Sequence, residues 1–571
     1  MDNHLFVAPG DLTQLSAHAI AYSASNYLGR DGNLFSSFRA HVPGFAPWYI
    51  ELARREAPRC TVGDTFWLEL DRRHRPHGVV VVVSTGRGDV PDKAGAAVRA
   101  SFTTAVERLR AMGHNERLLI ALPAFRVGMG GDRRQRLHSA RLQVAAALDV
   151  LQQHDRADAV FLTYTPTLYQ IFLEARRQLL GSPPADVDRY PALEQALLAG
   201  ECVLFAGAGL SRGAGLPDWD ELVRRLASDL GIDAQQRLDY LDLAQWHRER
   251  FGPAAMAEVI RQTFSHPERT PLPTLAHYLL LSLPLRHVIT TNYDDLLERA
   301  LTALKRHPIK VVQQEDVART GTGGVYVVKL HGDAGSPEEI VLSRDDYDEF
   351  FTRRPAMALL LEGLLLNQTF FFVGYGLRDP NFRQIYSRIA RILREARRPA
   401  YATTFEATGD RGPYLRQQWR NKQLHLIPIE GADDEERERH FLRFLDCLAE
   451  EVTLRRPGLF LAPDVDVPPA LTALRSLLTE RVGHELEELT QLELSGPEVL
   501  HLAEVLQFLA SHGWRPRPYG GRDLCRLWAE LAEQAPDPAS RRRMLIQALA
   551  CAEAFADVER IRARLESSGG R

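Results

Sequence analysis

Cysteine is scarce in this sequence, which has five in 571 residues. They stand far apart, and no two of them form a Cys-x-x-Cys pair; they are Cys60, Cys202, Cys447, Cys525 and Cys551. An odd number of widely spaced cysteines argues against a disulfide framework and against a cysteine zinc site. We therefore expect a cytoplasmic protein, because that compartment is reducing, and we expect no bound metal.

Long hydrophobic runs and an excess of one charge are also missing. The most apolar runs, such as 79–83 and 369–373, are far too short to span a bilayer. The N-terminus has no basic segment followed by an apolar core, so no signal peptide is expected. The net charge of -4 gives no electrostatic reason to expect nucleic acid or a membrane surface as a partner.

Strands and helices alternate in two successive parts of the chain, which predicts an α/β fold in each. In the first part, 1–180, strands are expected within 19–26 and at 78–83, 117–124 and 159–164, and helices at 96–112, 137–153 and 169–180. The second part, 190–455, follows the polar linker 181–186. Its expected strands are 202–206, 286–291, 310–313, 325–331, 369–374 and 424–428, and its expected helices are 220–230, 236–250, 254–264, 294–304 and 434–452. Beyond a proline-rich connector at 456–469 the strand signals disappear, which predicts an all-α domain over 470–571.

Four strands of the second part end in polar or glycine-rich tips. The tips are FAGAGLSRGAGLPDW (205–219), ITTNYDD (289–295), VVKLHGD (327–333) and FFVGYGLRDPNF (371–382). Because the carboxyl ends of parallel strands meet at one edge of a sheet, we expect these tips to form one crevice. The first tip, a strand opening through glycines into a helix, can bring backbone N–H groups to a diphosphate. Taken alone, it is equally compatible with a turn that binds nothing.

The order GAG-x-S, G-x-PD-aromatic, T-x-N-x-D, LHG and G-Y-G-x-x-D resembles the sirtuin NAD-binding fold, a Rossmann-like parallel sheet. It is most similar to the bacterial sirtuin-like proteins of antiphage defence, and the resemblance covers about 190–430. Trp219 stands where Phe is usual, and Asp220 where many sirtuins have Arg. The four-cysteine zinc ribbon expected after the LHG segment is absent. That absence argues against a protein deacylase and fits the defence branch, whose members hydrolyse NAD.

The resemblance implies a set of residues that bind NAD as substrate. They are Gly207, Ala208, Gly209, Ser211, Asp218, Trp219, Thr290, Asp294 and Gly374. The glycine segment with Ser211 would cradle the diphosphate. Asp218 and Trp219 would lie on a loop over the nicotinamide riboside, Asp294 would accept a hydrogen bond from the carboxamide, and the Gly374 tip would bind the adenosine side.

The resemblance also implies two catalytic residues, Asn292 and His331. Breaking the nicotinamide–ribose bond builds positive charge on C1′, so the site must stabilise that charge and present water. Asn292 would position the water through its carbonyl oxygen, and His331 would act as general base or orienter near the ribose hydroxyls. From the residues alone, Asn292 is also compatible with a helix cap and His331 with a buried histidine at a strand end.

The first part resembles the macro domain, a fold that binds ADP-ribose. The resemblance rests on Gly10-Asp11-Leu12-Thr13, on Ala24-Ser25-Asn26, and on 121–124 followed by the glycines of 128–131. Ser23 and Ser25 depart from the usual Asn and Ala of the second segment. The resemblance implies an ADP-ribose-type ligand, and the alternative is a scaffold or a protein contact.

Together these observations predict an NAD+ glycohydrolase that yields nicotinamide and ADP-ribose and acts in antiphage defence by NAD+ depletion. One alternative is a sensor that binds NAD or an ADP-ribose-type signal without turnover. Another is a protein deacylase or ADP-ribosyltransferase. The C-terminal helices would contact a protein partner or a phage trigger, or else complete the core as a cap. We expect a homo-oligomer and no membrane partner.

Overall fold

The computed structural model describes most of the first 455 residues. The described residues are 3–29, 33–57, 59–70, 75–85, 92–125, 136–181, 189–217, 219–232, 239–264, 271–319, 324–336, 340–375, 398–406 and 410–455, with short runs between 528 and 548. The chain divides into two compact units. The first comprises 1–126, 142–165 and 179–452, and the second comprises 127–141, 166–178 and 453–571.

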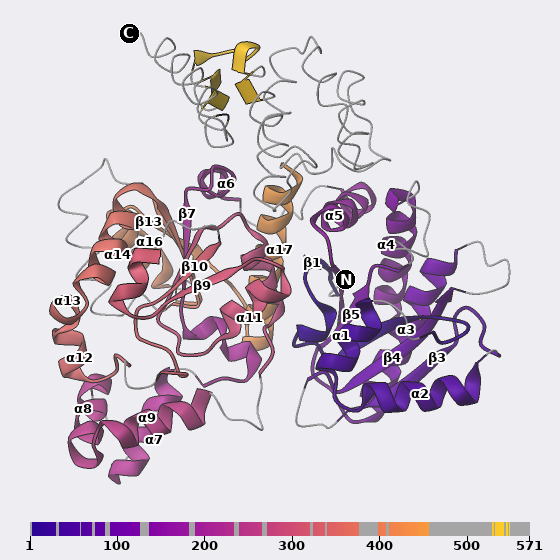
Figure 1. Ribbon diagram of the computed structural model, residues 1–571, viewed down its shortest axis with the longest axis horizontal. Helices are drawn as coiled ribbons and strands as arrows, with labels where there is room; N and C mark the ends of the chain where they lie inside the picture. Colours follow the sequence, from indigo (N-terminus) through magenta and orange to yellow (C-terminus); the bar gives the residue numbers. More distant parts are fainter. Residues whose placement is uncertain are drawn as a thin grey trace. The chain divides into compact units, whose positions relative to one another are not determined.

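The N-terminal sheet of the first unit has six strands in the order β1-β6-β5-β2-β4-β3. Figure 1 labels β1, β3, β4 and β5 of this sheet. The elements of this region are β1 (Leu5–Pro9), η1 (Leu12–Gln14), β2 (Ala19–Ser25), α1 (Asn33–His41), α2 (Phe45–Glu56), β3 (Thr65–Glu69), β4 (Gly78–Thr85), α3 (Lys93–Ala111), β5 (Leu118–Pro123), α4 (Arg136–Gln153), β6 (Ala157–Thr163) and α5 (Pro166–Leu180). Every strand pair is parallel except β3 with β4, which is antiparallel. The four strands and three helices predicted here are confirmed as β2, β4, β5 and β6 and as α3, α4 and α5.

The valine run of β4 forms part of the hydrophobic core of this sheet. Residues 79–83 are all fully buried, as a strand covered on both faces requires. On one face the ring of Tyr22 from β2 packs about 5 Å from the rings of Phe45 and Tyr49 of α2. Strand β3 and helices α1 and α2 are elements that the sequence analysis did not predict. Most residues of β3 are only partly buried, because it is an edge strand with a weak apolar pattern.

The second sheet has seven strands, all parallel, in the order β13-β12-β11-β7-β8-β10-β9. The elements of this region are α6 (Pro191–Leu198), β7 (Cys202–Ala206), η3 (Ala208–Leu210), η4 (Arg212–Ala214), α7 (Trp219–Leu230), α8 (Tyr240–Phe251), α9 (Pro253–Phe264), α10 (Leu275–Ser282), β8 (His287–Thr290), α11 (Leu296–Ala303), β9 (Pro308–Val311), η5 (Gln314–Arg319), β10 (Val325–Lys329), α12 (Arg344–Asp348), α13 (Phe350–Arg353), α14 (Pro355–Asn367), β11 (Thr369–Val373), β12 (Ala400–Thr404), α16 (Gly412–Arg420), β13 (Leu424–Pro428) and α17 (Asp434–Leu454).

Two strands of this sheet differ from the prediction. Strand β9 lies two residues before the predicted 310–313, because the N–H groups of Val312 and Gln313 both donate to the Asp316 carboxylate and leave the ladder. Strand β12 was not predicted. Its sequence, AYATT, lacks an apolar run, and it is buried by its place between β11 and β13. Both differences arise from tertiary contacts, which a local sequence pattern does not reveal.

The order of the strands places a topological switch point at β7. From β7 the chain continues to β8 on one side, whereas β11, the neighbour on the other side, leads to β12 and β13. In open parallel sheets, ligands bind at such a point beyond the carboxyl ends of the strands. All four predicted tips begin at that edge, since they follow β7, β8, β10 and β11, and residues 376–382 of the fourth tip lie outside the described residues.

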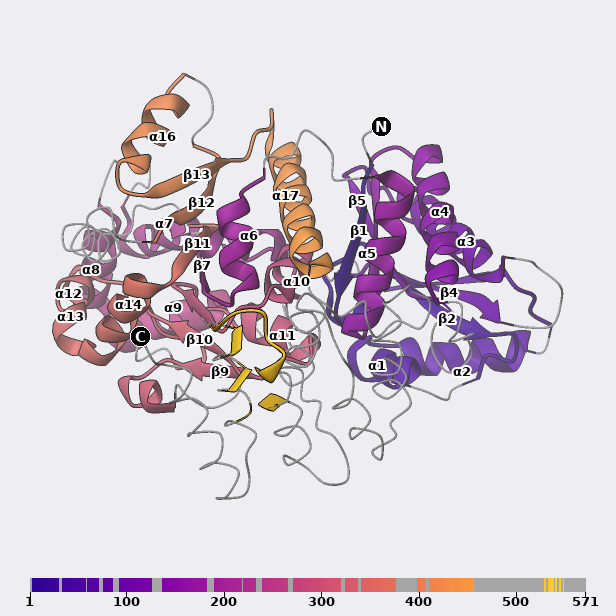
Figure 2. The same cartoon turned by 90° about the horizontal axis from the view of Figure 1, so that it is seen from above.

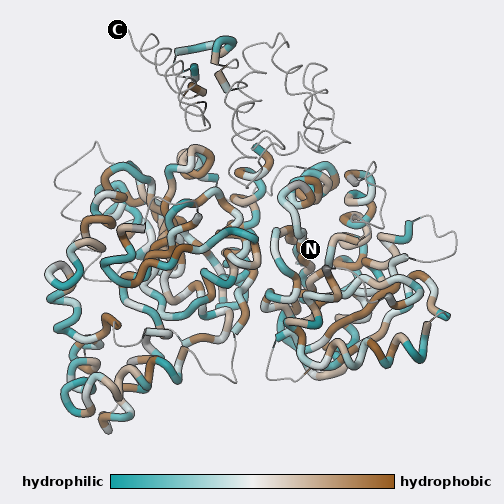
Figure 3. The backbone as a smooth tube through the Cα atoms, in the orientation of Figure 1, coloured by the Kyte–Doolittle hydropathy of each residue, from teal (hydrophilic) through white to brown (hydrophobic). Residues whose placement is uncertain are grey.

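Helices cover both faces of the second sheet, and successive residues of β7 alternate between them. Leu204 packs in the core that includes α6, α10, α11 and α17, and Figure 2 shows α6, α10 and α17 along this face. Phe205 packs in the opposite core, which includes α12, α13 and α14. The buried strands of this sheet are among its most hydrophobic segments (Figure 3).

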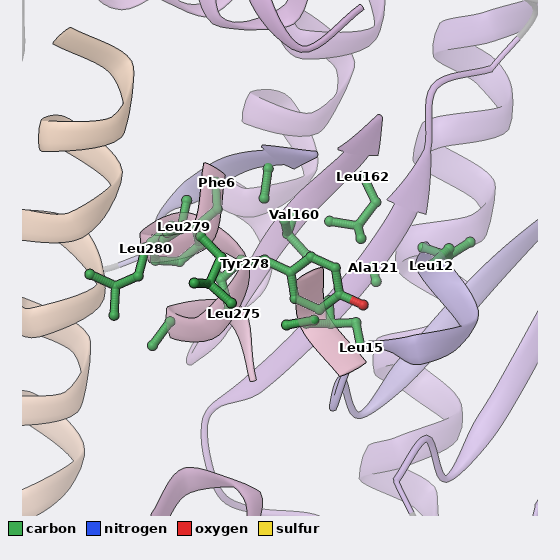
Figure 4. Packing of buried hydrophobic residues seen from close by; sticks show 14 of the residues in the cluster. Phe6, Leu12, Leu15, Ala121, Val160, Leu162, Leu275, Tyr278, Leu279 and Leu280 are labelled. Carbon is green, nitrogen blue, oxygen red and sulfur yellow. The ribbon is translucent and has the colours of Figure 1, made fainter. Parts of the chain in front are cut away.

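Helix α10 joins the two sheets of the first unit through Tyr278. Its side chain is fully buried among Phe6, Val160 and Leu162 of the N-terminal sheet (Figure 4). The Tyr278 hydroxyl donates to the Asp11 carbonyl at 3.3 Å. Gly10 has a φ of +141°, and a Cβ there would lie 2.1 Å from the Tyr278 ring, so only glycine fits under this ring. The two sheets therefore share one hydrophobic core.

The predicted all-α domain over 470–571 falls mostly outside the described residues. The described residues of that range include short helical runs, with Trp528, Ala532 and Leu545 buried. Among the described helices, none combines the length and the apolar character needed to cross a bilayer. The predicted domain boundaries stay predictions.

Candidate functional site

The glycine segment after β7 is held against the tip of β11 by backbone hydrogen bonds. The N–H of Gly207 donates to the Val373 carbonyl, and the N–H of Gly209 donates to the Gly374 carbonyl, each at 2.9 Å. A Cβ on Gly374 would lie 2.4 Å from the Leu210 nitrogen, and Gly374 has a φ of +61°. A Cβ on Gly207 would lie 2.4 Å from the Gly374 oxygen. Glycine is thus required on both sides of this approach.

Three backbone N–H groups of the predicted diphosphate cradle are already engaged in hydrogen bonds within the protein. The N–H groups of Gly207 and Gly209 are already donated to β11, and the N–H of Ser211 donates to the Ala208 carbonyl at 3.0 Å. The Ser211 hydroxyl is a different kind of donor. It accepts a hydrogen bond from Asn292 at 3.1 Å, so its own proton is available to a ligand. The role of Ala208 and Gly209 as phosphate donors stays a prediction.

Asn292 is held at this edge by hydrogen bonds from both its backbone and its side chain. Its backbone N–H donates to the Thr290 hydroxyl at 3.0 Å, and that hydroxyl donates to the Ala206 carbonyl at 2.9 Å. Its side-chain Nδ2 donates to the Gly207 carbonyl and to Ser211 Oγ, both at 3.1 Å. Because a carbonyl can only accept, these contacts fix which amide atom is nitrogen. The amide therefore has one orientation.

The other amide atom, Asn292 Oδ1, is buried and has no hydrogen-bond partner among the described residues. A buried acceptor left unpaired costs about 1–3 kcal/mol. A bound water or hydroxyl that donates to Oδ1 would recover that free energy. This atom is the strongest indication of a ligand at the crevice.

The alternative interpretation of Asn292 as a helix cap does not describe its side chain. The N-cap of α11 is Asp295, and the Oδ1 of the preceding Asp294 accepts from the Leu296 N–H at 3.1 Å. Asp294 is buried, as Asn292 is. Its predicted contact with a carboxamide stays a prediction, and one of its carboxylate oxygens is already engaged with the Leu296 N–H.

His331 reaches the same edge through the pairing of β8 with β10. Thr290 is opposite Lys329 in the register, and the Leu330 N–H donates to the Thr290 carbonyl at 2.9 Å. His331 and Asn292 therefore follow directly from neighbouring strand ends. The His331 ring is buried, and its centroid lies 5.2 Å from that of Tyr347 in an edge-on arrangement. The structure thus brings the two predicted catalytic residues to adjacent tips.

The predicted cover over the nicotinamide riboside is described only in part. Asp218 lies outside the described residues. Trp219 is the first residue of α7, and its side chain also lies outside the description. Gly215, which precedes them, has a φ of +79° at the end of η4, a backbone conformation that glycine adopts readily. The roles of Asp218 and Trp219 stay predictions.

A buried charge cluster that the sequence patterns did not predict lies at the ends of β10 and α11. Lys329, the last residue of β10, is fully buried, and its Nζ lies 2.7 Å from Asp333 Oδ2 and 3.5 Å from Glu298 Oε1. Burial alone would lower the Lys329 pKa, but the carboxylates of Glu298 and Asp333 outweigh it and raise the pKa. Burial raises the Glu298 pKa. The only sequence signal was a lysine ending the apolar strand VYVVK.

A cavity of about 480 Å³ lies beside the His331 turn. The Val341 N–H donates to the His331 carbonyl at 3.0 Å, and Val341 lines the cavity. The other lining residues come from α8, α9 and the segments around η5, α12 and α13: Arg248, Pro253, Met256, Ala257, Ile260, Val312, Gln313, Gln314, Glu315, Ile340, Asp346, Phe350, Arg353 and Arg354. None of the predicted NAD-binding residues is among them.

Part of the second sheet region matches a known domain family. Residues 286–427 match the family model described as the SIR2-like domain. That range contains β8 to β13 and three of the four tips. The chain therefore contains a SIR2-like domain, as the motif order predicted.

Similar curated proteins carry specific names. The chain is 30% identical over 254 residues to the NAD(+) hydrolase ThsA of Cytobacillus dafuensis, which covers 44% of this chain and 48% of that protein. It is 34% identical over 200 residues to the NAD(+) hydrolase ThsA of Acinetobacter baumannii, covering 35% and 41%. It is 28% identical over 204 residues to Defense-associated sirtuin 2 of Bacillus subtilis, covering 34% and 20%. The chain thus spans less than half the length of each of these relatives.

Among solved structures, macrodomains are similar to part of the chain. The Oceanobacillus iheyensis macrodomain with ADP has a TM-score of 0.27 and 18% identity, and covers 31% of this chain and 93% of that chain. The Trypanosoma brucei macrodomain in complex with ADP-ribose has a TM-score of 0.25 and 17% identity, and covers 30% and 67%. Values this low carry no conclusion about a ligand.

Proposed function

We propose that this chain hydrolyses NAD+ to nicotinamide and ADP-ribose in the crevice beyond β7, β8, β10 and β11. The observation that carries the proposal is Asn292, whose amide is fixed by Gly207 and Ser211 while its Oδ1 is buried and unpaired. The names of the ThsA relatives support the same reaction. NAD+ is the substrate, and no metal takes part in the proposal.

The proposed reaction breaks the bond between C1′ of the ribose and the nicotinamide nitrogen. The bonding electron pair leaves with nicotinamide, and positive charge develops at C1′. A water held by Asn292 Oδ1 adds to C1′ and releases one proton. His331, at the neighbouring tip, is the base that orients a ribose hydroxyl or takes this proton. The Ser211 hydroxyl donates to the diphosphate.

The biological setting is a separate part of the proposal. An enzyme that destroys NAD+ suits a defence effector that is held inactive until triggered, and one relative is named a defense-associated sirtuin. We assign the effector to the cytoplasm as a homo-oligomer, with an ADP-ribose-type ligand at the N-terminal region. A protein partner or phage trigger would act through the C-terminal helices.

The test is release of nicotinamide from NAD+ by the purified full chain, followed by chromatography. We expect wild type to release nicotinamide and ADP-ribose in equal amounts, and Asn292→Ala and His331→Ala to lose at least about 10²-fold in rate. Asn421→Ala is the matched control, because Asn421 is exposed at the end of α16. Activity that survives both site substitutions would refute the site.

The same assay separates the alternatives. Tight binding of NAD+ with no product, even with extract of infected cells as the trigger, would favour a sensor. Transfer of labelled ADP-ribose to protein would favour a transferase. Release of nicotinamide only when an acylated peptide is added would favour a deacylase.

A further inference from the structure

Lys329 contacts two turns of the crevice at once. Its Nζ donates to the carbonyls of Tyr293, at 3.2 Å, and of Asp294. These carbonyls belong to the two residues directly after Asn292. In the sequence, Lys329 precedes His331 by two residues, and Asp333 follows His331 by two. Lys329 Nζ lies 2.7 Å from Asp333 Oδ2. One ammonium group therefore joins the Asn292 turn to the His331 turn.

Other bonds follow the same path between the two turns. The Ala334 N–H donates to the Tyr293 carbonyl at 2.9 Å, and the Tyr293 hydroxyl donates to the Val341 carbonyl at 3.0 Å. The Asp333 carboxylate also accepts from the Gly335 N–H at 2.8 Å and from Lys310 at 3.0 Å. Lys329 lies at the centre of these contacts because its Nζ binds the Tyr293 and Asp294 carbonyls and also Asp333.

A lysine is an unexpected choice for the end of this strand. The preceding β10 residues Val325, Val327 and Val328 are buried and apolar, and Lys329 is itself fully buried. Taking an ammonium out of water is costly, and apolar residues of similar volume often replace a buried ion pair without loss of stability. A contribution to folding stability alone therefore does not explain why position 329 carries an ammonium group. What an apolar residue cannot supply is three directed donors.

We propose that Lys329 is a positioning residue that holds the Asn292 and His331 turns in mutual register for the reaction. The inference rests on the proposed function, and it concerns geometry rather than contact with NAD+. A displacement of about 1 Å between groups that act on one bond can cost about 10²-fold in rate. Lys329 prevents that displacement.

The test must separate positioning from simple charge balance. Lys329→Met removes the donors and takes a buried cation from beside the carboxylates of Asp333 and Glu298, so this single variant is expected to be unstable. The informative variant is Lys329→Met with Asp333→Asn and Glu298→Gln, in which the buried cluster is neutral. Lys310→Met is the matched control, because Lys310 also pairs with Asp333 but is 43% exposed and is absent from the bonds to the turn carbonyls.

The first readout is hydrogen exchange followed by mass spectrometry, which needs no activity. In the full-length triple variant, we expect faster exchange in peptides covering 289–295 and 330–336 than in wild type, whereas Lys310→Met exchanges as wild type does. The melting temperature of the triple variant should lie closer to wild type than that of Lys329→Met. Unchanged exchange in both peptides would overturn the inference.

The second readout is steady-state NAD+ hydrolysis. We expect the triple variant to lose about 10²-fold in kcat with KM within about threefold of wild type, since the turns are displaced while the diphosphate contacts remain. Wild-type kcat in the triple variant would overturn the inference, as would an equal loss in Lys310→Met. A wild type that releases no nicotinamide would refute the proposed function instead, and the exchange result would still decide the role of Lys329.

Discussion

The side-chain amide of Asn292 donates to the carbonyl of Gly207 at 3.1 Å and so connects the end of β8 to the end of β7. The same nitrogen donates to Ser211 Oγ. The contact with the Gly207 carbonyl needs a donor at this position, because a carbonyl oxygen can only accept. An acceptor placed there would face two oxygens.

The first prediction follows from this requirement. Asn292→Asp keeps the size of the side chain but replaces the donating amide by a carboxylate, which can only accept. We expect kcat for NAD+ hydrolysis to fall at least about 10²-fold, because the group that orients the water is turned or displaced. Steady-state kinetics on the purified chain measure this, with Asn421→Asp as the control. A wild-type rate in Asn292→Asp would show that the amide does not orient the reaction.

The second prediction concerns the close approach of the first and last tips. Gly374→Ala would place a Cβ 2.4 Å from the Leu210 nitrogen at a φ of +61°, so backbone must move. We expect a loss of about 1–3 kcal/mol in the free energy of unfolding, measured in urea.

Gly363→Ala is the matched control for that substitution. Gly363 lies in α14, and a Cβ there has open space. Alanine is the better helix former, so we expect no loss and a gain of up to about 1 kcal/mol. Equal losses in the two variants would contradict the steric account of the Gly374 tip.

The third prediction tests the contact between the two sheets. Tyr278→Ala should cost about 3–5 kcal/mol, because a buried aromatic side chain is removed. Gly10→Ala should also destabilise, since its Cβ would lie 2.1 Å from the Tyr278 ring. In the double variant the clash is absent, so the two losses should fall short of additivity by at least about 1 kcal/mol. Strict additivity in urea unfolding would show that the ring does not constrain Gly10.

The fourth prediction is a pH dependence of stability from His277. His277 is fully buried, and its Nδ1 accepts from the Thr274 N–H at 3.2 Å in the cap of α10. Burial lowers its pKa from 6.5 to about 3. Between these two values the unfolded chain binds a proton that the folded chain excludes, so stability falls as the pH drops below 6.5.

At pH 5 this one histidine should cost about 2 kcal/mol relative to pH 7. His277→Gln removes the titrating group, so the loss between pH 7 and pH 5 should be smaller by about that amount. Urea unfolding at the two pH values measures the difference. An identical pH dependence in the variant would show that His277 is already protonated in the folded chain.

Local patterns were sufficient for the parts of the fold that have a strong period or an apolar run. The valines of β4 and the phenylalanines of β11 predicted buried strands, and the parallel arrangement then predicted that Asn292 and His331 meet at one edge. Strands β3 and β12 were missed because each is set by its neighbours. Short polar or half-exposed strands acquire their structure from pairing, which a sequence window does not contain.

The sequence predicted which strand ends meet at the crevice, but it did not predict the hydrogen bonds between them. Motif order pointed to Gly207, Ser211, Asn292 and His331. It did not indicate that the Gly207 N–H would already be donated to Val373, or that Lys329 would contact both the Asn292 turn and Asp333 of the His331 turn. Such contacts depend on the distance between strands that are far apart in the sequence, here β8, β10 and β11.

The most direct test of the account is the NAD+ content of cells that express the full chain and are infected with phage. This measurement does not depend on knowing the trigger. The account predicts that NAD+ falls and ADP-ribose rises after infection in cells with wild type and with Gly363→Ala, and that both stay at resting levels with Asn292→Ala. NAD+ that falls equally with Asn292→Ala would contradict it.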